Sequence, residues 1–321
     1  MPSAPNEQPL AALRVLDVSV GEAARVGRLL ADLGADVVKV VAPEQAQRSG
    51  PGPLIAGISI ADLLDNANKR RLPLDPDNVD DRRTFLELAG ESDIVIDSGN
   101  PGRTAAFGLS AAELADQFDH LVVLSVTDFG TQGPRSGWRA SDPVLYALSS
   151  VLSRSGPPGA PPVLPPQGIA SATAAAQAAW AVLVAYYQRL RTGRGDFVDF
   201  SRYEAVLQAL DPPFGAQGQA AAARGIAGAH RGRPKRQDSY PIFACRDGFV
   251  RICLLAPRQW RAMRRWLGEP AAFQDPEYDH IAVRAAAFDE IGAAISALFA
   301  EHDTAELVDE GSARGVPVAA V

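Results

Sequence analysis

LRVLDVSVGEAARVGRLLADLGADVVKVV, residues 13–41, is the stretch that decides the fold of this chain. Residues 13–18 and 36–41 are apolar runs typical of buried strands. Between them, residues 22–33 repeat apolar side chains every three to four positions, which predicts a helix, and Gly34 follows where glycine commonly ends one. A strand, a helix and a strand in this order predict a parallel pair. We therefore expect an α/β fold built on a Rossmann-like, doubly wound parallel sheet.

The same alternation continues along the first two thirds of the chain. We expect further strands at residues 93–97, 120–126 and 197–201, and helices at 81–90, after Ser110, and at 168–188. The strands are nearly all apolar, which is typical of strands covered on both faces. These elements predict one large Rossmann-like domain over residues 1–210.

A second unit follows a stretch rich in proline, glycine and alanine. Residues 211–238 have little periodicity and predict a linker between domains. Residues 240–244 and 249–254 then predict a hairpin, and helices are expected at 258–267 and 285–300. Residues 239–321 are therefore expected to form a second, smaller α+β domain.

Composition excludes several classes of partner. The net charge of −7 argues against a general nucleic-acid-binding surface. The two cysteines have no metal-binding spacing and predict neither a metal site nor a disulfide framework, so we expect a cytoplasmic protein. Residues 168–188 carry no charge and are long enough to span a bilayer, but they are mostly alanine, so we expect a buried helix and no membrane span.

The turn after the first strand argues against a dinucleotide. A Rossmann site needs G-x-G-x-x-G at this turn, so that the backbone can approach a pyrophosphate. This chain has only Gly21, followed by Glu22, whose carboxylate would repel a phosphate at the start of the helix. We therefore expect neither a nicotinamide nor a flavin cofactor.

Several segments, in order, identify the chain as similar to a known family. They are LADLGADVVKV at residues 30–40, NKRR at 68–71, SVTDFGTQGP at 125–134 and TGRG at 192–195. Together they resemble the family III CoA-transferases, the carnitine and bile-acid type. The resemblance implies a large Rossmann-like domain with CoA or acyl-CoA bound along it, a smaller second domain, and an interlocked homodimer. It implies the transfer of CoA between carboxylic acids.

The resemblance also marks a catalytic position. In the family an aspartate at the start of the long helix attacks the acyl-CoA, and this chain has Ser171 there. Ser171 is either a nucleophile or, as we favour, a helix N-cap or packing residue, because serine is common at helix starts. Asp142 is the second candidate, either as a relocated catalytic carboxylate or as a structural aspartate of its loop.

The family's CoA-binding segments indicate the remaining candidates. By resemblance, the contacts to CoA are Asn68, Lys69, Arg70, Ser98, Gly99, Asn100 and Arg139. For Lys69 and Arg70 a solvated basic turn is an equally good interpretation.

Two functions remain open at this point. The first is a divergent CoA-transferase that handles acyl-CoA. The second is a catalytically inactive scaffold or half-domain that pairs with an active, related partner. The sequence ends at Val321, whereas family members continue with a segment that returns to the large domain, so we expect that segment to be absent here.

Overall fold

The protein is described by a computed structural model that covers residues 8–43, 53–55, 57–149, 151–156, 160–209 and 240–321. The chain divides into two compact units, Met1–Arg233 and Pro234–Val321. The division falls within the predicted linker, residues 211–238, which itself lies outside the described residues.

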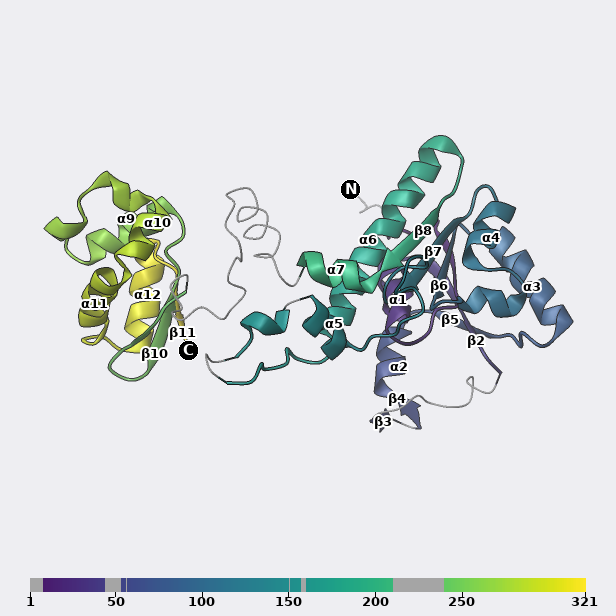
Figure 1. The fold of residues 1–321 in the computed structure, drawn as a ribbon, viewed down its shortest axis with the longest axis horizontal. Helices are drawn as coiled ribbons and strands as arrows, with labels where there is room; N and C mark the ends of the chain where they lie inside the picture. Colours follow the sequence, from purple (N-terminus) through teal and green to yellow (C-terminus); the bar gives the residue numbers. More distant parts are fainter. Residues whose placement is uncertain (1–7, 44–52, 56, 150, 157–159, 210–239) are drawn as a thin grey trace, which may run out of the picture. The chain divides into compact units, whose positions relative to one another are not determined.

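Unit 1 is built on a six-stranded sheet in the order β5-β2-β1-β6-β7-β8, with every neighbouring pair parallel (Figure 1). The strands are β1 (Arg14–Asp17), β2 (Asp36–Val41), β5 (Arg70–Pro73), β6 (Ile94–Ser98), β7 (Val122–Thr127) and β8 (Phe197–Ser201). The chain starts in the middle, runs outward through β2 and β5, and then returns to fill the other half. This is the strand order of a doubly wound Rossmann-type sheet, so the predicted fold class is confirmed.

Helices cover both faces of this sheet (Figure 1). One face packs on α1 (Ala24–Asp32) and α6 (Ile169–Thr192), and the other on α3 (Val79–Gly90) and α4 (Ala111–Gln117). The strands divide their side chains between these two cores, because successive residues of a strand point to opposite faces. Ile94 and Ile96 of β6 lie in the first core, and Val95 lies in the second.

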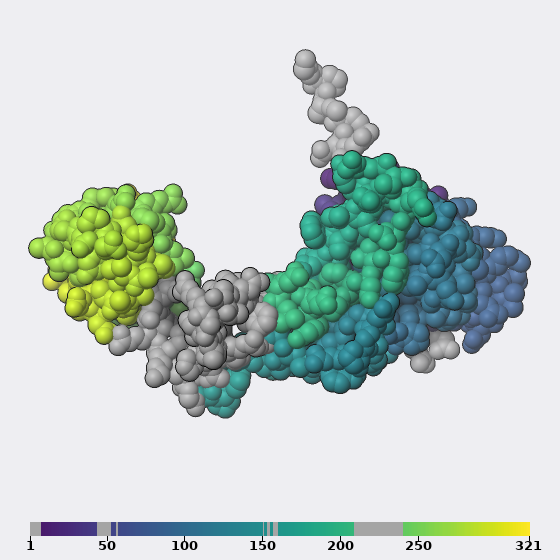
Figure 2. All heavy atoms as spheres, turned by 45° about the horizontal axis from the view of Figure 1, so that its top comes forward, coloured from purple at the N-terminus to yellow at the C-terminus, as the bar shows by residue number. Residues whose placement is uncertain are grey.

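The long helix α6 is a core helix of unit 1. Its length and hydropathy would also suit a membrane span. However, its small side chains, including Ala174, Ala175 and Ala178, are buried against the sheet and α1. Its opposite side contributes to the surface of unit 1 (Figure 2), where Trp180 is 70% exposed. In the described structure this helix packs on the sheet and on α1 through its alanines.

Shorter elements complete unit 1. They are η1 (Gly21–Ala23), β3 (Leu54–Ile55), β4 (Ile58–Ser59), α2 (Ile60–Asp65), η2 (Arg103–Phe107), α5 (Asp142–Leu148), η3 (Val151–Arg154) and α7 (Arg202–Ala209).

Unit 2 has an antiparallel sheet in the order β11-β10-β9, with helices packed on it. Its strands are β9 (Ile242–Ala244), β10 (Phe249–Ile252) and β11 (Val318–Ala320). Its helices are α9 (Pro257–Trp266), η5 (Ala271–Phe273), η6 (Pro276–Asp279), α10 (Ile281–Ala286), α11 (Phe288–Phe299) and α12 (Thr304–Arg314). The predicted hairpin is therefore present, and it gains a third strand from the end of the chain.

Candidate functional site

The carboxyl ends of the parallel strands form one edge of the sheet in unit 1. In a doubly wound sheet the ligand crevice lies at this edge, where neighbouring strands lead away in opposite directions. Here that point lies between β1 and β6. The two following loops are joined by a hydrogen bond of 3.0 Å from the Val20 amide to the Ser98 hydroxyl oxygen.

Three predicted CoA contacts lie in the loop at this point. Ser98 is buried, while Gly99 has φ +91°, a conformation that favours glycine. The exposed Asn100 donates its side-chain amide to the carbonyls of Thr131 and Ser136, at 3.3 and 3.1 Å. The structure therefore brings Ser98, Gly99 and Asn100 to the edge where a ligand would bind.

A buried carboxylate shapes this loop. Asp97 accepts hydrogen bonds from the amides of Ser98 and Arg103, both at 2.7 Å, and from the Thr104 hydroxyl at 2.8 Å. Burial raises the pKa of Asp97, and these hydrogen bonds oppose the increase. A Cβ at residue 102 would come within 1.9 Å of the carboxylate, so only Gly102 fits here.

Ser171 and Asp142 meet in the interior of unit 1. The Ser171 hydroxyl donates to Asp142 Oδ1 at 2.5 Å, and the Ser171 amide donates to Oδ2 at 3.4 Å. Ser171 is 2% exposed and Asp142 is 6% exposed. They lie 29 positions apart in the sequence, on α6 and at the start of α5. The structure therefore brings the two predicted catalytic candidates, Ser171 and Asp142, into direct contact from different helices.

Arg202 connects this pair to two more carboxylates. Its Nη2 donates to Ser171 Oγ at 2.8 Å and to Asp142 Oδ1 at 3.2 Å, and also contacts Glu22. Its Nη1 donates to Asp128 Oδ1 at 2.6 Å. We call these five residues the Arg202 cluster. One guanidinium faces three carboxylates, so the cluster carries an excess of negative charge.

The cluster is only partly closed. The side chains of Arg202 and Asp128 are 12% and 17% exposed, whereas that of Glu22 is 43% exposed. Arg202 offsets the charge of Glu22 only in part, because the same guanidinium also pairs with Asp128 and Asp142. Glu22, Asp128 and Arg202 each follow a strand of the sheet, namely β1, β7 and β8.

The structure corrects one interpretation of Ser171. The N-cap of α6 is Gly168, and Ser171 is the third residue of the helix, so the N-cap interpretation is wrong. Its hydroxyl instead bridges Asp142 and Arg202.

Lys69 lies in a second charged group, which we call the Asp17 cluster and which consists of Asp17, Lys39 and Lys69. The Lys69 ammonium donates to Asp17 Oδ2 at 2.8 Å, to the Ala24 carbonyl at 2.6 Å and to Asn66 Oδ1 at 2.9 Å. An ammonium has only three donors, and this side chain is 0% exposed. Neither the solvated turn nor the predicted contact to a CoA phosphate fits Lys69 in this arrangement.

The other basic and amide candidates lie elsewhere. Arg70 makes an exposed ion pair with Asp36, and Asn68 donates to Asp32 at 2.7 Å. Arg139 is exposed and has no ion-pair or hydrogen-bond partner within the part of the chain that the structure describes. These three are not brought together with Ser98, Gly99 and Asn100 by any contact between described residues.

The sequence contained a signal for the residues that were missed. Asp128 and Arg202 directly follow the strand-like runs of β7 and β8, and Glu22 lies in the turn after β1, where the strands of a parallel sheet bring their ends to one edge. The described residues contain no group of three His, Cys, Asp or Glu side chains placed to hold a metal ion.

Comparisons with known proteins agree with this architecture. The sequence model of CoA-transferase family III matches residues 10–321. Probable CoA-transferase Rv1866 of Mycobacterium tuberculosis is 60% identical over 303 residues, which are 94% of this chain and 38% of that protein. The chain thus spans well under half of that relative's length.

For two further similar proteins, a larger share of their length aligns with this chain. Succinyl-CoA:(R)-benzylsuccinate CoA-transferase subunit BbsE of Thauera aromatica is 31% identical over 85% of this chain and 67% of its own. The crystal structure of Rv3272 from M. tuberculosis superposes with a TM-score of 0.79 at 25% identity, over 98% of this chain and 84% of that one. The chain belongs to CoA-transferase family III.

Proposed function

We propose that this chain binds acyl-CoA and transfers CoA between carboxylic acids, with Asp142 as the reacting carboxylate and Ser171 as its hydrogen-bond donor. The observation that carries the proposal is the 2.5 Å contact between Ser171 Oγ and Asp142 Oδ1. It supports the proposal because a carboxylate lies in contact with Ser171, the position that the family resemblance marked as catalytic. Family membership supplies the reaction class.

The proposed reaction needs only the acyl-CoA donor, the acceptor carboxylate and Asp142. An Asp142 oxygen attacks the acyl carbon of the donor thioester, the C–S bond breaks, and CoA leaves as a thiolate with the electron pair. The thiolate then attacks the aspartyl carbon of this mixed anhydride and releases the donor acid as a carboxylate. The acceptor carboxylate attacks the resulting aspartyl-CoA thioester, and the released thiolate attacks the acceptor's acyl carbon. Asp142 is regenerated as a carboxylate.

Each neighbour has a proposed part in this chemistry. Arg202 balances the charge of Asp142, and the Ser171 hydroxyl holds one carboxylate oxygen in place. Ser98, Gly99 and Asn100 are proposed to contact CoA, because their loop lies at the crevice between β1 and β6. Arg139 is proposed to bind a phosphate group of CoA, since its guanidinium has no other partner within the described residues.

A second reaction is favoured by the same short contact. If Asp142 acts as a base, it takes the Ser171 proton while Ser171 Oγ attacks the thioester and CoA leaves. The product is an acyl ester of serine, which is less activated than an anhydride, and its reaction with water gives net thioester hydrolysis. This alternative predicts no CoA-bearing adduct on the protein.

Assembly is proposed from the relatives, and location from the cysteine content of this chain. Some are subunits by name, such as BbsE and the alpha and beta subunits of the succinyl-CoA–L-malate CoA-transferase of Chloroflexus aurantiacus. We propose that this chain also works in a pair, either with a second copy or with a related domain, and that it acts in the cytoplasm.

Mass spectrometry can distinguish these reactions. The purified chain is mixed with succinyl-CoA, the donor that several relatives are named for, and with benzylsuccinate, malate, glutarate or oxalate as acceptor. We expect a new acyl-CoA and a CoA thioester on Asp142. Asp142→Asn should abolish both, and Ser171→Ala should lower the rate about tenfold, the cost of one charge-assisted hydrogen bond.

The remaining outcomes reject the proposal. An acyl group on Ser171 together with free CoA indicates the hydrolytic reaction. CoA binding in a calorimeter without transfer or adduct indicates a catalytically inactive half that needs an active partner. If millimolar CoA gives no heat and no thermal shift, the chain does not handle CoA at all.

A further inference from the structure

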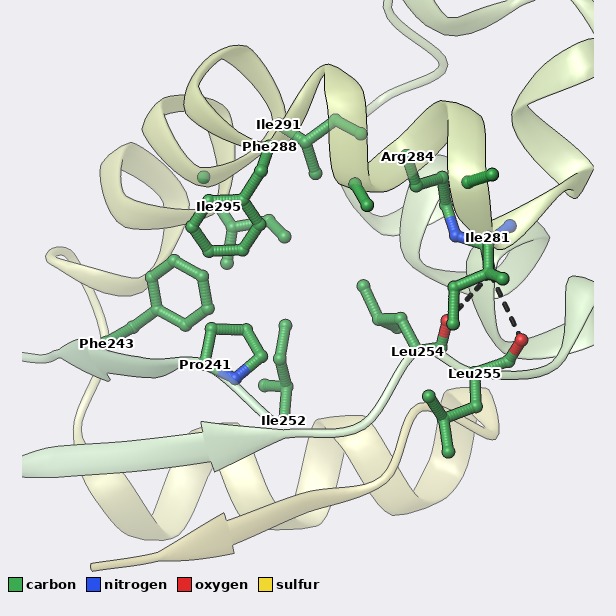
Figure 3. Close-up of a pocket in the computed structure, with 13 residues that line it drawn as sticks. Pro241, Phe243, Ile252, Leu254, Leu255, Ile281, Arg284, Phe288, Ile291 and Ile295 are labelled. Atoms are coloured by element: carbon green, nitrogen blue, oxygen red, sulfur yellow. Dashed lines mark hydrogen bonds between the residues drawn. The ribbon is translucent and has the colours of Figure 1, made fainter. Parts of the chain in front are cut away.

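Unit 2 contains a pocket that is separate from the residues discussed above. It has a volume of about 190 Å³ and lies between the strands β9 and β10 and the helices α10 and α11 (Figure 3). Apart from Arg284, its walls are apolar. Its walls include the side chains of Phe243, Ile252, Leu254, Phe288, Ile291 and Ile295. An engineered apolar cavity of about 150 Å³ in another protein binds benzene, so this space suits a group of that size.

Gly292 keeps part of this space open. It lies inside α11, where glycine is destabilising relative to alanine because it has more backbone freedom to lose on folding. A Cβ at this position would meet the rings of Phe288 and Phe243 at 3.9 and 4.0 Å, which is ordinary contact. The packing therefore does not require glycine here. A side chain larger than alanine at position 292 would extend into the pocket and fill part of it.

Arg284 brings a positive charge to the wall. Its Nη1 donates to the carbonyls of Tyr278 and Asp279, and its Nη2 donates to those of Leu254 and Leu255, all at 2.6–3.1 Å. These acceptors are neutral. The nearby Asp279 carboxylate pairs with Arg261, and no carboxylate of the described residues lies within ion-pair distance of Arg284. The buried guanidinium therefore has no direct counter-ion among the described residues, although the Asp279 carboxylate favours its charged form from beyond ion-pair distance.

The pocket opens to solvent beside this charge. Ile281 and Leu255, which lie next to Arg284 in Figure 3, are 50% and 41% exposed. An apolar group inside the pocket can therefore have its polar end at the rim, near the guanidinium.

We propose that this pocket binds a small carboxylic acid, as its anion, whose apolar part is one aromatic ring or a short alkyl chain. The apolar part fills the space that Gly292 leaves open. The carboxylate lies toward Arg284 and is attracted by its positive charge, which has no carboxylate within ion-pair distance among the described residues. The site is independent of the reaction proposed for Asp142.

Phenylacetate is a suitable probe, with phenylacetamide as its neutral counterpart and acetate as the charge without the ring. Because four isoleucines line the pocket, the full-length chain can be labelled at its isoleucine methyl groups and followed by NMR during titration. We expect shifts confined to Ile252, Ile281, Ile291 and Ile295, and a dissociation constant on the order of 1 mM from the burial of one ring. Phenylacetamide should bind more weakly, and acetate should cause no shifts.

Two variants of α11 test the position. Gly292→Leu fills the pocket and improves helix propensity, so it should fold and weaken phenylacetate binding about tenfold or more. Ala293→Leu, at the neighbouring exposed position, adds the same side chain outside the pocket and should bind as the parent protein does. Equal binding of phenylacetate and phenylacetamide would overturn the role of Arg284. Absence of binding, unchanged binding in Gly292→Leu, or equal loss in Ala293→Leu would overturn the site.

Discussion

Unit 1 contains two buried charged groups whose compositions are opposite. The Asp17 cluster places two lysines around one carboxylate, and its Asp17 and Lys69 side chains are 0% exposed. The Arg202 cluster places three carboxylates and a serine around one arginine, and its Glu22 side chain reaches solvent. The Asp17 cluster is closed to solvent, so its charges can only stabilise the strands and helices around it. The Arg202 cluster is partly open, so its side chains can also contact a bound ligand.

The difference in exposure between the two clusters also explains which predictions from the sequence were wrong. Lys69 lies in a basic segment and looks free, yet it is enclosed and fully bonded. Glu22 was expected to act alone at the helix start, yet it shares Arg202 with Asp128 and Asp142. Charge in the sequence therefore did not predict charge available at the surface.

The largest effect is expected from Asp17→Asn. It keeps the shape of the side chain but leaves two buried lysines without their counter-charge, so we expect the free energy of unfolding to fall by about 3–5 kcal/mol. Urea unfolding would measure it. Asp36→Asn is the matched control, because its partner Arg70 is exposed, and it should change stability little. If the two variants lose equally little, the Asp17 cluster is not the structural anchor described here.

Arg202→Met should have an intermediate effect. It leaves Asp142 and Asp128 without their cation, but Glu22 can be hydrated, so we expect a loss of about 2–3 kcal/mol in the free energy of unfolding. Unlike Asp17→Asn, it should also abolish CoA transfer at temperatures where the protein is folded. Full activity in this variant would contradict the assignment of the Arg202 cluster to the site.

The smallest expected effect is on the free energy of unfolding at low pH. Burial acts to raise the pKa of Asp17, but Lys39 and Lys69 outweigh it and hold this pKa below the usual value of 3.8. Between the lowered pKa and 3.8 the unfolded chain binds more protons, so this contribution to stability is complete above 3.8 and is lost as the pH falls through the window. Urea unfolding across this range should therefore show a steeper loss in the parent protein than in Asp17→Asn. If the unfolding free energies of the two proteins fall in parallel with pH, the lowered pKa of Asp17 does not contribute to stability.

Elements with strong local signals were predicted well. The run DVVKVV matches β2 residue for residue. The helix expected after Ser110 begins there, with a capping box between Ser110 and Glu113, and α12 begins in the same way at Asp303 with Glu306. In each case the signal consists of neighbouring residues, so no distant contact is needed to form it.

Elements that depend on distant partners were missed. β5 begins with two arginines and ends with a proline, a composition suited to an exposed edge strand but without an apolar pattern. β11 is only three residues long and exists because β10 offers it hydrogen bonds from 66 or more positions earlier in the sequence. Neither has a local signal that exceeds that of a loop.

For this protein the sequence by itself determined the alternation of strands and helices, the doubly wound sheet and the family, because these follow from periodicity and from motifs in order. Only the tertiary structure decided that Ser171 touches Asp142, that Arg202 joins them, and that Lys69 is enclosed. These contacts join residues 29 to 60 positions apart. Whether a charged side chain is bonded or free depends on which distant groups the fold brings to it, and no local pattern contains that information.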